Sequence, residues 1–317
     1  MTYVADWEDS NPLHFRIGAE FMDKNRKKKG INERKLTFGL FMVPGLFMYS
    51  VFFILPILLG IYYSMTDWNG ISPKFSFIGL KNYGKIMTDT AFRRVLGFNI
   101  RYTIILVIGT CILAVFLALL LNTQIKGRSF FRALYFFPAV LSMLTVSLIF
   151  NQIFYRVIPS IGAQLNSEVL SRNILANKNL AMYGILFVHI WQGVALPTLL
   201  FLAGLQTIPD ELYEAAALDG ATLVQKFKYI TFYYLLPTLS VVLVLTLKSG
   251  LMVFDYIKSM TEGGPAGSTQ SIAFLIYNDG FVKNRYSYGI AEAIVAGLII
   301  ASISLIQIKL TDRKKVE

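Results

Sequence analysis

Charged residues, cysteine and histidine are all scarce in this sequence, and each shortage argues against a class of protein. Charged side chains make up 15% of the 317 residues, whereas an average soluble domain has about 25%. The single cysteine, Cys111, lies inside an apolar run and excludes a framework of intrachain disulfides. The two histidines, His14 and His189, argue against a multi-histidine metal site. We therefore expect no metal centre and no catalytic constellation on this chain.

Apolar residues are abundant instead, and they gather in long runs. The sequence is 55% hydrophobic, and its mean hydropathy is +0.55. Several runs reach the roughly 20 residues that an α-helix needs to cross a bilayer, which predicts an all-α polytopic membrane protein with about six transmembrane helices. The expected spans are residues 38–64, 101–121, 130–155, 181–205, 233–256 and 288–308.

Basic residues flank these spans. The tail over residues 1–35 is basic, and the apolar run after it is too long for the core of a signal peptide. We therefore expect a retained cytoplasmic tail followed by a transmembrane domain over residues 36–317. With six spans, the 122–132 loop, the 206–230 loop and both termini share one side, which the positive-inside rule makes cytoplasmic. Charges that flank spans, rather than line a soluble face, give no reason to expect nucleic-acid binding.

The stretch 206–221 is a polar, alanine-rich insert between two apolar spans. Thr207 and Pro209 form a helix-start pattern of capping hydroxyl and early proline. Gly220 supplies a stop, because glycine accepts the left-handed conformation that ends a helix. The pattern predicts a short helix, a break and a second helical piece over about residues 207–224.

The predicted helix is too short to be stable alone and too polar to enter lipid. Leu212, Ala215 and Ala216 fall on one face at helical spacing, and their mostly small side chains would allow another protein to approach closely. The simpler alternative is an amphipathic loop helix that lies on its own membrane domain.

The same stretch resembles a known motif. Glu214-Ala215-Ala216, followed at fixed spacing by Gly220 and Ile230, is similar to the EAA motif of permease subunits of bacterial ABC importers. Segments 77–83, 130–138 and the Thr-x-Gly-Gly-Pro element at 261–265 resemble the maltose-type and glycerol-phosphate-type branch of that family.

One departure from the family pattern follows the motif. Phe232-Tyr233 stands where the family usually has Leu-Pro, and the next proline is Pro237. The substitution can change the angle at which the following span begins, but it leaves the residues of the EAA motif itself unchanged.

The resemblance implies a type I ABC importer permease fold in the bacterial inner membrane, with both termini cytoplasmic. The 207–224 stretch would be the coupling helix, which docks on a separate ATPase subunit. ATP-Mg would bind to that partner, so this chain would carry no cofactor and would not itself be an enzyme. The coupling residues implied are Glu211, Glu214, Ala215, Ala216, Asp219 and Gly220.

The resemblance also implies further partners and a function. The partners are a homologous second permease subunit, two ATPase copies and an extracytoplasmic solute-binding protein, which Gly263, Gly264 and Pro265 would contact. The expected function is ATP-driven, binding-protein-dependent import of a sugar or oligosaccharide. The alternatives are a stand-alone channel or secondary transporter for a small polar solute, which would need no docking helix, and a structural membrane scaffold.

Polar groups inside the spans are candidates for the translocation pathway, because they are expensive in lipid. Lys248 lies well inside the fifth expected span, where an ammonium that faces lipid costs roughly 3 kcal/mol or more. Asp255 is two helical turns further on, so a structural ion pair is at least as reasonable as contact between Lys248 and an acidic oligosaccharide. The other candidates are Asn151, Gln152, His189, Trp191, Gln192 and Glu292.

Overall fold

The computed structural model describes residues 37–123, 128–168 and 170–312. The predicted cytoplasmic tail over residues 1–35, the last residues of the C-terminal tail and Lys126 of the basic 122–132 loop lie outside the described residues. The chain divides into two units, Met1–Tyr62 and Tyr63–Glu317.

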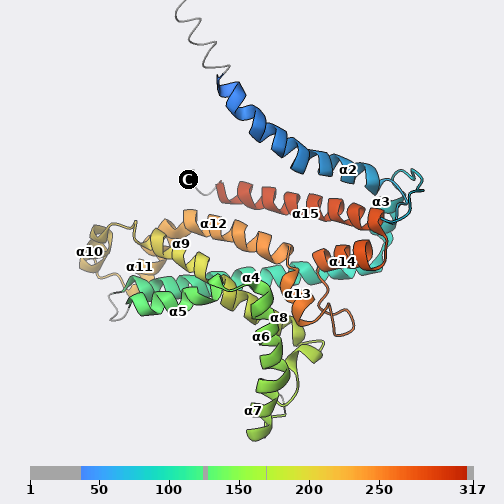
Figure 1. Cartoon of the computed structure of the whole chain (residues 1–317). Helices are drawn as coiled ribbons and strands as arrows, with labels where there is room; N and C mark the ends of the chain where they lie inside the picture. Colours follow the sequence, from blue (N-terminus) through green and yellow to red (C-terminus); the bar gives the residue numbers. More distant parts are fainter. Residues whose placement is uncertain (1–36, 124–127, 169, 313–317) are drawn as a thin grey trace, which may run out of the picture. The chain divides into compact units, whose positions relative to one another are not determined.

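The first unit contains a long apolar helix (Figure 1). This helix, Thr37–Ser64, includes a π-helical turn η1 (Ser50–Ile54) and α2 (Leu55–Ser64), and it is 28 residues long. At 1.5 Å per residue its length is about 42 Å, which is enough to cross the roughly 30 Å hydrocarbon core of a bilayer. None of its most apolar window is buried. The first predicted span is confirmed.

The second unit is built on α4 (Thr90–Asn122), a helix of 33 residues. Its buried residues recur every three or four positions from Phe92 to Leu121, so one face of α4 packs against three successive hydrophobic clusters. The predicted start at residue 101 was wrong. Asp89 ends α3 (Lys81–Thr88) and accepts a hydrogen bond from Ala91 N as the N-cap of α4, so the helix begins eleven residues before the predicted start of the span.

The predicted third span is divided. α5 (Arg128–Val140) is a separate helix with Pro138 near its end, and α6 (Met143–Gln152) begins after a break at residues 141–142. Proline cannot continue a helical hydrogen-bond ladder, and Ser142 takes an extended backbone conformation. α6 continues through η2 (Ile153–Val157) into α7 (Ile158–Gln164), so the span is Met143–Gln164 rather than 130–155.

The predicted fourth span is present but bent. After a short 3₁₀ turn, η3 (Ile174–Ala176), α8 (Ala181–Gly193) and α9 (Ala195–Leu205) meet at an angle of 48°. α9 packs against α4 and against α12 (Phe232–Leu251). A Cβ atom at Gly204 would lie 2.7 Å from Thr238 Oγ1, and one at Gly250 would lie 2.9 Å from Thr103 Oγ1. Glycine therefore permits both close helix contacts, as is common in membrane bundles.

The rest of the chain alternates short and long helices. α10 (Asp210–Leu218) and α11 (Leu223–Lys226) lead through η4 (Phe227–Thr231) into α12. α13 (Asp255–Met260), α14 (Ile272–Tyr277), η5 (Asn278–Val282) and α15 (Tyr286–Asp312) follow. The fifth span is Leu223–Leu251 rather than 233–256, and the sixth is Tyr286–Lys309.

Figure 1 shows α4, α9 and α12 side by side in one layer, with α10 and α11 at one end and α3 and α14 at the other. Within the described residues, five helices are long and apolar enough to cross a membrane, and six if the bent α8–α9 pair counts as one span. The predicted all-α polytopic fold with about six spans is confirmed.

Candidate functional site

The α10–α11 segment has the predicted helix, break and second helix. α10 begins at Asp210 after Pro209, and Asp210 and Glu211 lie in its first turn, where the helix dipole favours negative charge. The predicted cap by Thr207 was wrong, because its hydroxyl donates to Gly204 O (2.7 Å) and so belongs to the end of α9.

The break after α10 depends on glycine. Gly220 has φ +73°, and Ala221 N donates to Ala216 O (2.9 Å) across the turn. Thr222 then caps α11 in a capping box with Gln225. The predicted role of Gly220 as the stop is confirmed.

One side of α10 is fixed to the membrane helices. Ile208, just before α10, is 7% exposed and belongs to the cluster formed by the ends of α4, α9 and α12. Tyr213 packs against the same cluster, and a hydrogen bond of 2.8 Å joins its hydroxyl to that of Thr231 at the start of α12. A movement of α10 therefore has a direct connection to α12.

The other side of the α10–α11 segment has exposed apolar side chains. Leu218 is 90% exposed, Leu223 is 85% exposed and Val224 is 75% exposed. We call these three residues the turn patch. Sequence reasoning missed them and chose Leu212, Ala215 and Ala216, of which Ala216 is half-buried. The sequence signal that could have indicated this patch is an apolar residue on each side of a glycine turn in a polar loop.

The acidic coupling candidates lie on the same segment as this patch. Glu211, Glu214 and Asp219 are exposed, and Ala215 is exposed beside them. An apolar patch with acidic residues near it is typical of a protein–protein docking site, whose centre is apolar and whose rim is polar.

A second group of candidates lies inside the helix bundle. His189 on α8 is 5% exposed and has both ring nitrogens engaged. Its Nδ1 lies 2.9 Å from the hydroxyl of Tyr102 on α4, and its Nε2 lies 2.8 Å from the hydroxyl of Ser249 on α12. Its ring also packs on Tyr256 of α13, with centroids 4.5 Å apart. His189 therefore joins four helices, and neither ring nitrogen is left for a ligand in this arrangement.

Gln192 and Asn151 also connect helices. Gln192 donates to Leu141 O (2.8 Å) and accepts from the Tyr256 hydroxyl (2.8 Å). Asn151 donates to Met260 O (3.0 Å). Trp191 packs edge to face on Phe150, whereas Gln152 is exposed. The structure thus brings His189 and Gln192 together around Tyr256 and leaves Gln152 apart.

Lys248 and Asp255 do not share a helical face. α12 ends at Leu251, and α13 starts at Asp255 after a break of three residues. The prediction of one continuous helix was wrong. Asn99 of α4 donates to Gly250 O (3.3 Å) and Leu251 O (2.9 Å), so a side chain from a distant helix satisfies the last carbonyls of α12. Lys248 and Asp255 are both exposed, and no ion pair joins them within the described chain.

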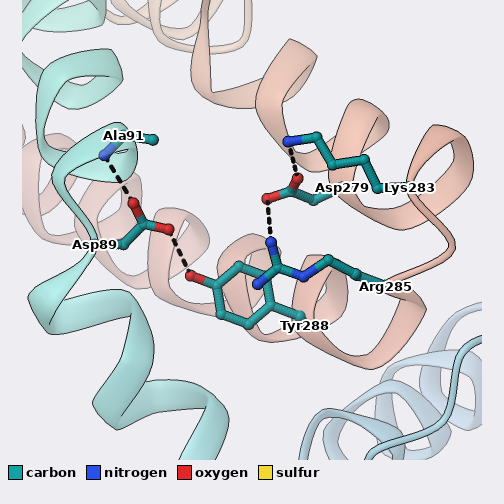
Figure 2. Close-up of polar contacts among 6 residues, drawn as sticks. All are labelled: Asp89, Ala91, Asp279, Lys283, Arg285 and Tyr288. Atoms are coloured by element: carbon teal, nitrogen blue, oxygen red, sulfur yellow. Dashed lines mark hydrogen bonds and ion pairs between the residues drawn. The ribbon is translucent and has the colours of Figure 1, made fainter.

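Glu292 lies in a polar cluster at the α3 end of the layer. Asp279 is 2% exposed, and Lys283 Nζ lies 2.6 Å and Arg285 Nη1 lies 3.8 Å from its carboxylate. Figure 2 shows both cations pointing at Asp279, while the Tyr288 hydroxyl points at Asp89. Glu292 is 0% exposed, and neither of its carboxylate oxygens has a hydrogen-bond partner among the described residues.

Asp89 holds this cluster to the start of α4. Its carboxylate accepts hydrogen bonds from Ala91 N (2.7 Å) and from the Tyr288 hydroxyl (2.9 Å), as Figure 2 shows. Burial alone would raise the pKa of Asp89, but these hydrogen bonds outweigh burial and lower the pKa below its ordinary value.

The Gly-Gly-Pro loop is internally bonded. The hydroxyls of Thr261 and Thr269 lie 2.8 Å apart, and that of Thr269 also donates to Gly264 O. Gly263 has φ +79° and is buried, and a Cβ atom there would lie 2.8 Å from Phe274. Gly264 and Pro265 are half-exposed. Gly263 is therefore required by the conformation and close packing of the loop. Of the three predicted contact residues, Gly264 and Pro265 are accessible to a partner.

Three relatives are similar to this chain in sequence, and one solved structure is similar in fold. The chain is 45% identical over 276 residues to the multiple sugar-binding transport system permease protein MsmF of Streptococcus mutans, covering 87% of this chain and 95% of that protein. It is 32% identical over 291 residues to the probable starch degradation products transport system permease protein AmyD of Thermoanaerobacterium thermosulfurigenes, covering 92% and 99%. It is 32% identical over 296 residues to the trehalose/maltose transport system permease protein MalF of Thermococcus litoralis, covering 91% and 98%.

The fold is similar to a chain in the crystal structure of a bacterial ABC transporter involved in the import of the acidic polysaccharide alginate. The TM-score is 0.77 at 22% identity, covering 91% of this chain and 99% of that chain. No protein-family model matches the chain. The relatives nevertheless align over nearly their whole lengths. The chain belongs to the permease subunits of sugar ABC importers, which are multi-pass inner-membrane transport proteins rather than enzymes.

Proposed function

We propose that the α10–α11 segment docks on a separate ATPase subunit and passes its movement to the membrane helices. The observation that carries this proposal is the turn patch, Leu218, Leu223 and Val224, exposed on a segment whose other side is fixed by Ile208 and Tyr213. Burial of such apolar side chains at an interface provides binding energy.

The contacts of α10 suggest how the movement travels. An ATPase that closes on ATP-Mg would displace α10 as a rigid body. The Tyr213–Thr231 hydrogen bond would carry the displacement into η4 and α12. At the far end of α12, Ser249 contacts His189, which also contacts α4 and α13. The network around His189 would therefore rearrange when the permease changes from an inward-facing to an outward-facing state.

The complete importer in this proposal contains this chain, a homologous second permease, two ATPase copies and an external solute-binding protein. The turn patch and both termini would face the cytoplasm, in agreement with the positive-inside rule. The α3–α14 end would face outward, where Gly264 and Pro265 would contact the solute-binding protein.

The substrate class follows from the relatives, whose names refer to multiple sugars, starch degradation products and trehalose/maltose. We propose a sugar or oligosaccharide. Lys248 is exposed next to Ser249, so its ammonium is available to the carboxylate of an acidic oligosaccharide. Lys248→Met should lower uptake of an acidic sugar several-fold and leave a neutral sugar unaffected. Equal uptake of the acidic sugar by both proteins would remove Lys248 from the pathway.

The docking proposal is tested with Leu218→Glu combined with Leu223→Glu in the full-length chain. Two buried charges in an apolar interface should reduce both ATPase co-purification and substrate-stimulated hydrolysis by about tenfold or more. Ile71→Glu with Leu80→Glu is the matched control, because those side chains are 73% and 67% exposed, Ile71 in the loop before α3 and Leu80 at the N-cap of α3.

Unchanged ATPase recovery with the Leu218 and Leu223 variant would contradict docking at the turn patch. Recovery of the wild-type chain as a stable, transporting species without any ATPase would instead favour a stand-alone channel or secondary transporter.

A further inference from the structure

A small cavity, which we call the α3 cavity, lies where α3 and the loop before it meet the start of α15. Its volume is about 170 Å³, which corresponds to about five or six water molecules at roughly 30 Å³ each. Ser287 N donates to Trp68 O (3.0 Å), and the hydroxyls of Thr66 and Ser287 lie 2.8 Å apart. The two segments are therefore held together, and a ligand between them is no larger than a single ring with a few polar substituents.

One wall of the α3 cavity contains a buried amide that is only half used. Asn82 on α3 is 4% exposed, and its Nδ2 donates to Ser64 O (2.8 Å) and Thr66 O (2.9 Å). These bonds fix the orientation of the amide, and its Oδ1 has no hydrogen-bond partner among the residues that the structure describes. A buried acceptor without a partner is costly. A ligand that donates to Asn82 Oδ1 would therefore be stabilised.

The rim of the cavity supplies both donors and acceptors. Lys85 and Asn284 are exposed, and neither side chain bonds to another residue of the described chain. Asn69 and Asp67 each use one side-chain oxygen, Oδ1, to accept from backbone N–H groups. The Asn69 amide nitrogen and the second Asp67 oxygen have no such bond. The rim can thus hydrogen-bond a ligand in both directions.

Two aromatic rings complete the lining. Trp68 is half-buried, and its Nε1 donates to Ser72 O (2.7 Å), which fixes the indole. Tyr288 lies under the guanidinium of Arg285, 4.1 Å from the ring centroid, and Figure 2 shows the two side chains together. The apolar C–H face of a sugar ring can pack on such aromatic surfaces.

The mixture of groups selects the chemical class of the ligand. A phosphate only accepts hydrogen bonds, and it would be repelled by Asp67, whereas a cation would be repelled by Lys85 and Arg285. A hydroxyl group both donates and accepts. A neutral ring with several hydroxyls can therefore donate to Asn82 Oδ1 and Asp67 while it accepts from the amides and cations of the rim.

We propose that the α3 cavity binds one neutral sugar ring. This inference rests on the proposed function, which supplies the sugar and the outward direction of the α3–α14 end. The cavity is distinct from the network around His189, which joins α4, α8, α12 and α13. A sugar that arrives at the outer face is held here by one of its rings before it enters the helix bundle.

The test uses the full-length chain, with the subunits that co-purify with it, in nanodiscs of neutral lipid washed free of solute-binding protein. The probes are methyl glucoside and methyl galactoside, each with one neutral sugar ring, and inorganic phosphate as the anionic alternative. The chain has three tryptophans, so 5-fluorotryptophan gives three fluorine signals. Trp68→Phe and Trp191→Phe identify the signals of the cavity and of the helix bundle.

At least one methyl glycoside should shift the Trp68 signal and leave the Trp191 signal in place. Lys85→Met with Asn284→Gly removes two hydrogen-bonding groups of the rim and should weaken this binding about tenfold. Glycine suits the second position, because Asn284 has φ +52°. The melting temperature should change little, since both side chains are exposed and without described partners.

The matched control is Lys178→Met with Asn166→Gly. Both side chains are exposed on the 156–180 loop, and Asn166 has φ +51°, so the control makes the same two changes away from the cavity. It should bind the methyl glycoside with wild-type affinity.

Three results would overturn the inference. One is an unshifted Trp68 signal with both glycosides while the complete importer takes up sugar, which would assign the cavity to water. Another is wild-type affinity in the Lys85 and Asn284 variant. The third is a Trp68 signal that phosphate shifts and the glycosides do not, which would assign the cavity to an anion. Failure of the complete wild-type importer to take up any sugar would contradict the proposed function itself.

Discussion

Each end of the α4 layer has a buried apolar cluster, and the two ends differ in the hydrogen bonds that accompany it. At the α3 end, directional hydrogen bonds cross between segments: Asn82 donates to Ser64 O and Thr66 O, the hydroxyls of Thr66 and Ser287 lie 2.8 Å apart, and Tyr288 donates to Asp89. At the α10 end, the apolar cluster is accompanied by the Tyr213–Thr231 hydrogen bond.

This difference suggests different mechanical roles. Buried hydrogen bonds need one geometry and are costly to leave unmade, so the α3 end should resist displacement. Apolar contacts are non-directional, so the α10 end can rotate or slide while its surface stays buried. A partner that pushes on α10 would then move a compliant end against a fixed one.

The largest expected effect comes from stiffening the turn at the compliant end. Gly220 has φ +73° and nothing within 4 Å of the place where a Cβ would lie, so a substitution costs backbone strain rather than a clash. Gly220→Val should cost about 1–2 kcal/mol locally, displace α11 and abolish the coupling of ATP hydrolysis to uptake. The measurement is sugar taken up per ATP hydrolysed in proteoliposomes.

Gly220→Asn is the control, because asparagine tolerates the left-handed conformation and fills the same open space. It should retain most of the coupling. Normal coupling in the Val variant would show that the turn is not part of the transmission.

At the fixed end, two buried acids should respond in opposite ways. Asp279→Asn removes the charge that Lys283 and Arg285 contact, and it should lower the free energy of unfolding by about 1–3 kcal/mol, since both cations are half-exposed and regain water. Glu292→Gln replaces a fully buried carboxyl group whose oxygens have no described hydrogen-bond partner, and burying an unpaired polar group is expensive. It should leave the melting temperature unchanged or raise it.

Thermal unfolding in nanodiscs measures both variants side by side. A large loss of stability in Glu292→Gln would reveal a favourable partner for that carboxylate and would remove the contrast between the two acids.

Much of the architecture could be predicted from the sequence, because the relevant signals are local. Apolar runs indicated the number of spans, and the glycine at 220 indicated the break after α10. The start of α4 was missed, because one capping residue, Asp89, extends the helix beyond its apolar part. The end of α12 was missed because Asn99, about 150 residues earlier, bonds its last carbonyls.

The site was only partly predictable for the same reason. His189 and Gln192 were recognisable as polar residues within a span, but their partners Tyr102, Ser249 and Tyr256 lie on three other helices. The turn patch was missed because exposure depends on which side of α10 is fixed. The hydrogen bond between Tyr213 and Thr231 fixes one side of α10, and no local sequence pattern predicts this contact.

A smaller effect is expected from the cap of α4 at the fixed end. Asp89→Ala removes the N-cap and the acceptor of Tyr288, and it should cost about 1 kcal/mol. The pKa of Asp89 is lowered in the folded protein. Its contribution is therefore present above the unfolded pKa of about 3.9 and is lost as the pH falls through the folded value.

The difference between wild type and Asp89→Ala in thermal unfolding should accordingly shrink below about pH 4. Asp89→Asn keeps a capping oxygen and should lie between them at neutral pH. A difference that persists unchanged in acid would assign the effect to packing rather than to the carboxylate.

The smallest expected change in stability is at the compliant end, and it tests the mechanical contrast directly. Tyr213→Phe removes one hydroxyl, leaves the ring in its apolar cluster and should cost about 1 kcal/mol or less. If that hydrogen bond carries the displacement of α10 into α12, the ratio of sugar taken up to ATP hydrolysed should fall several-fold. Tyr229→Phe, on an exposed ring in η4, is the matched control and should change neither quantity. If Tyr213→Phe lowers stability and leaves the ratio unchanged, the apolar cluster alone transmits the movement, and the directional contacts matter only at the α3 end.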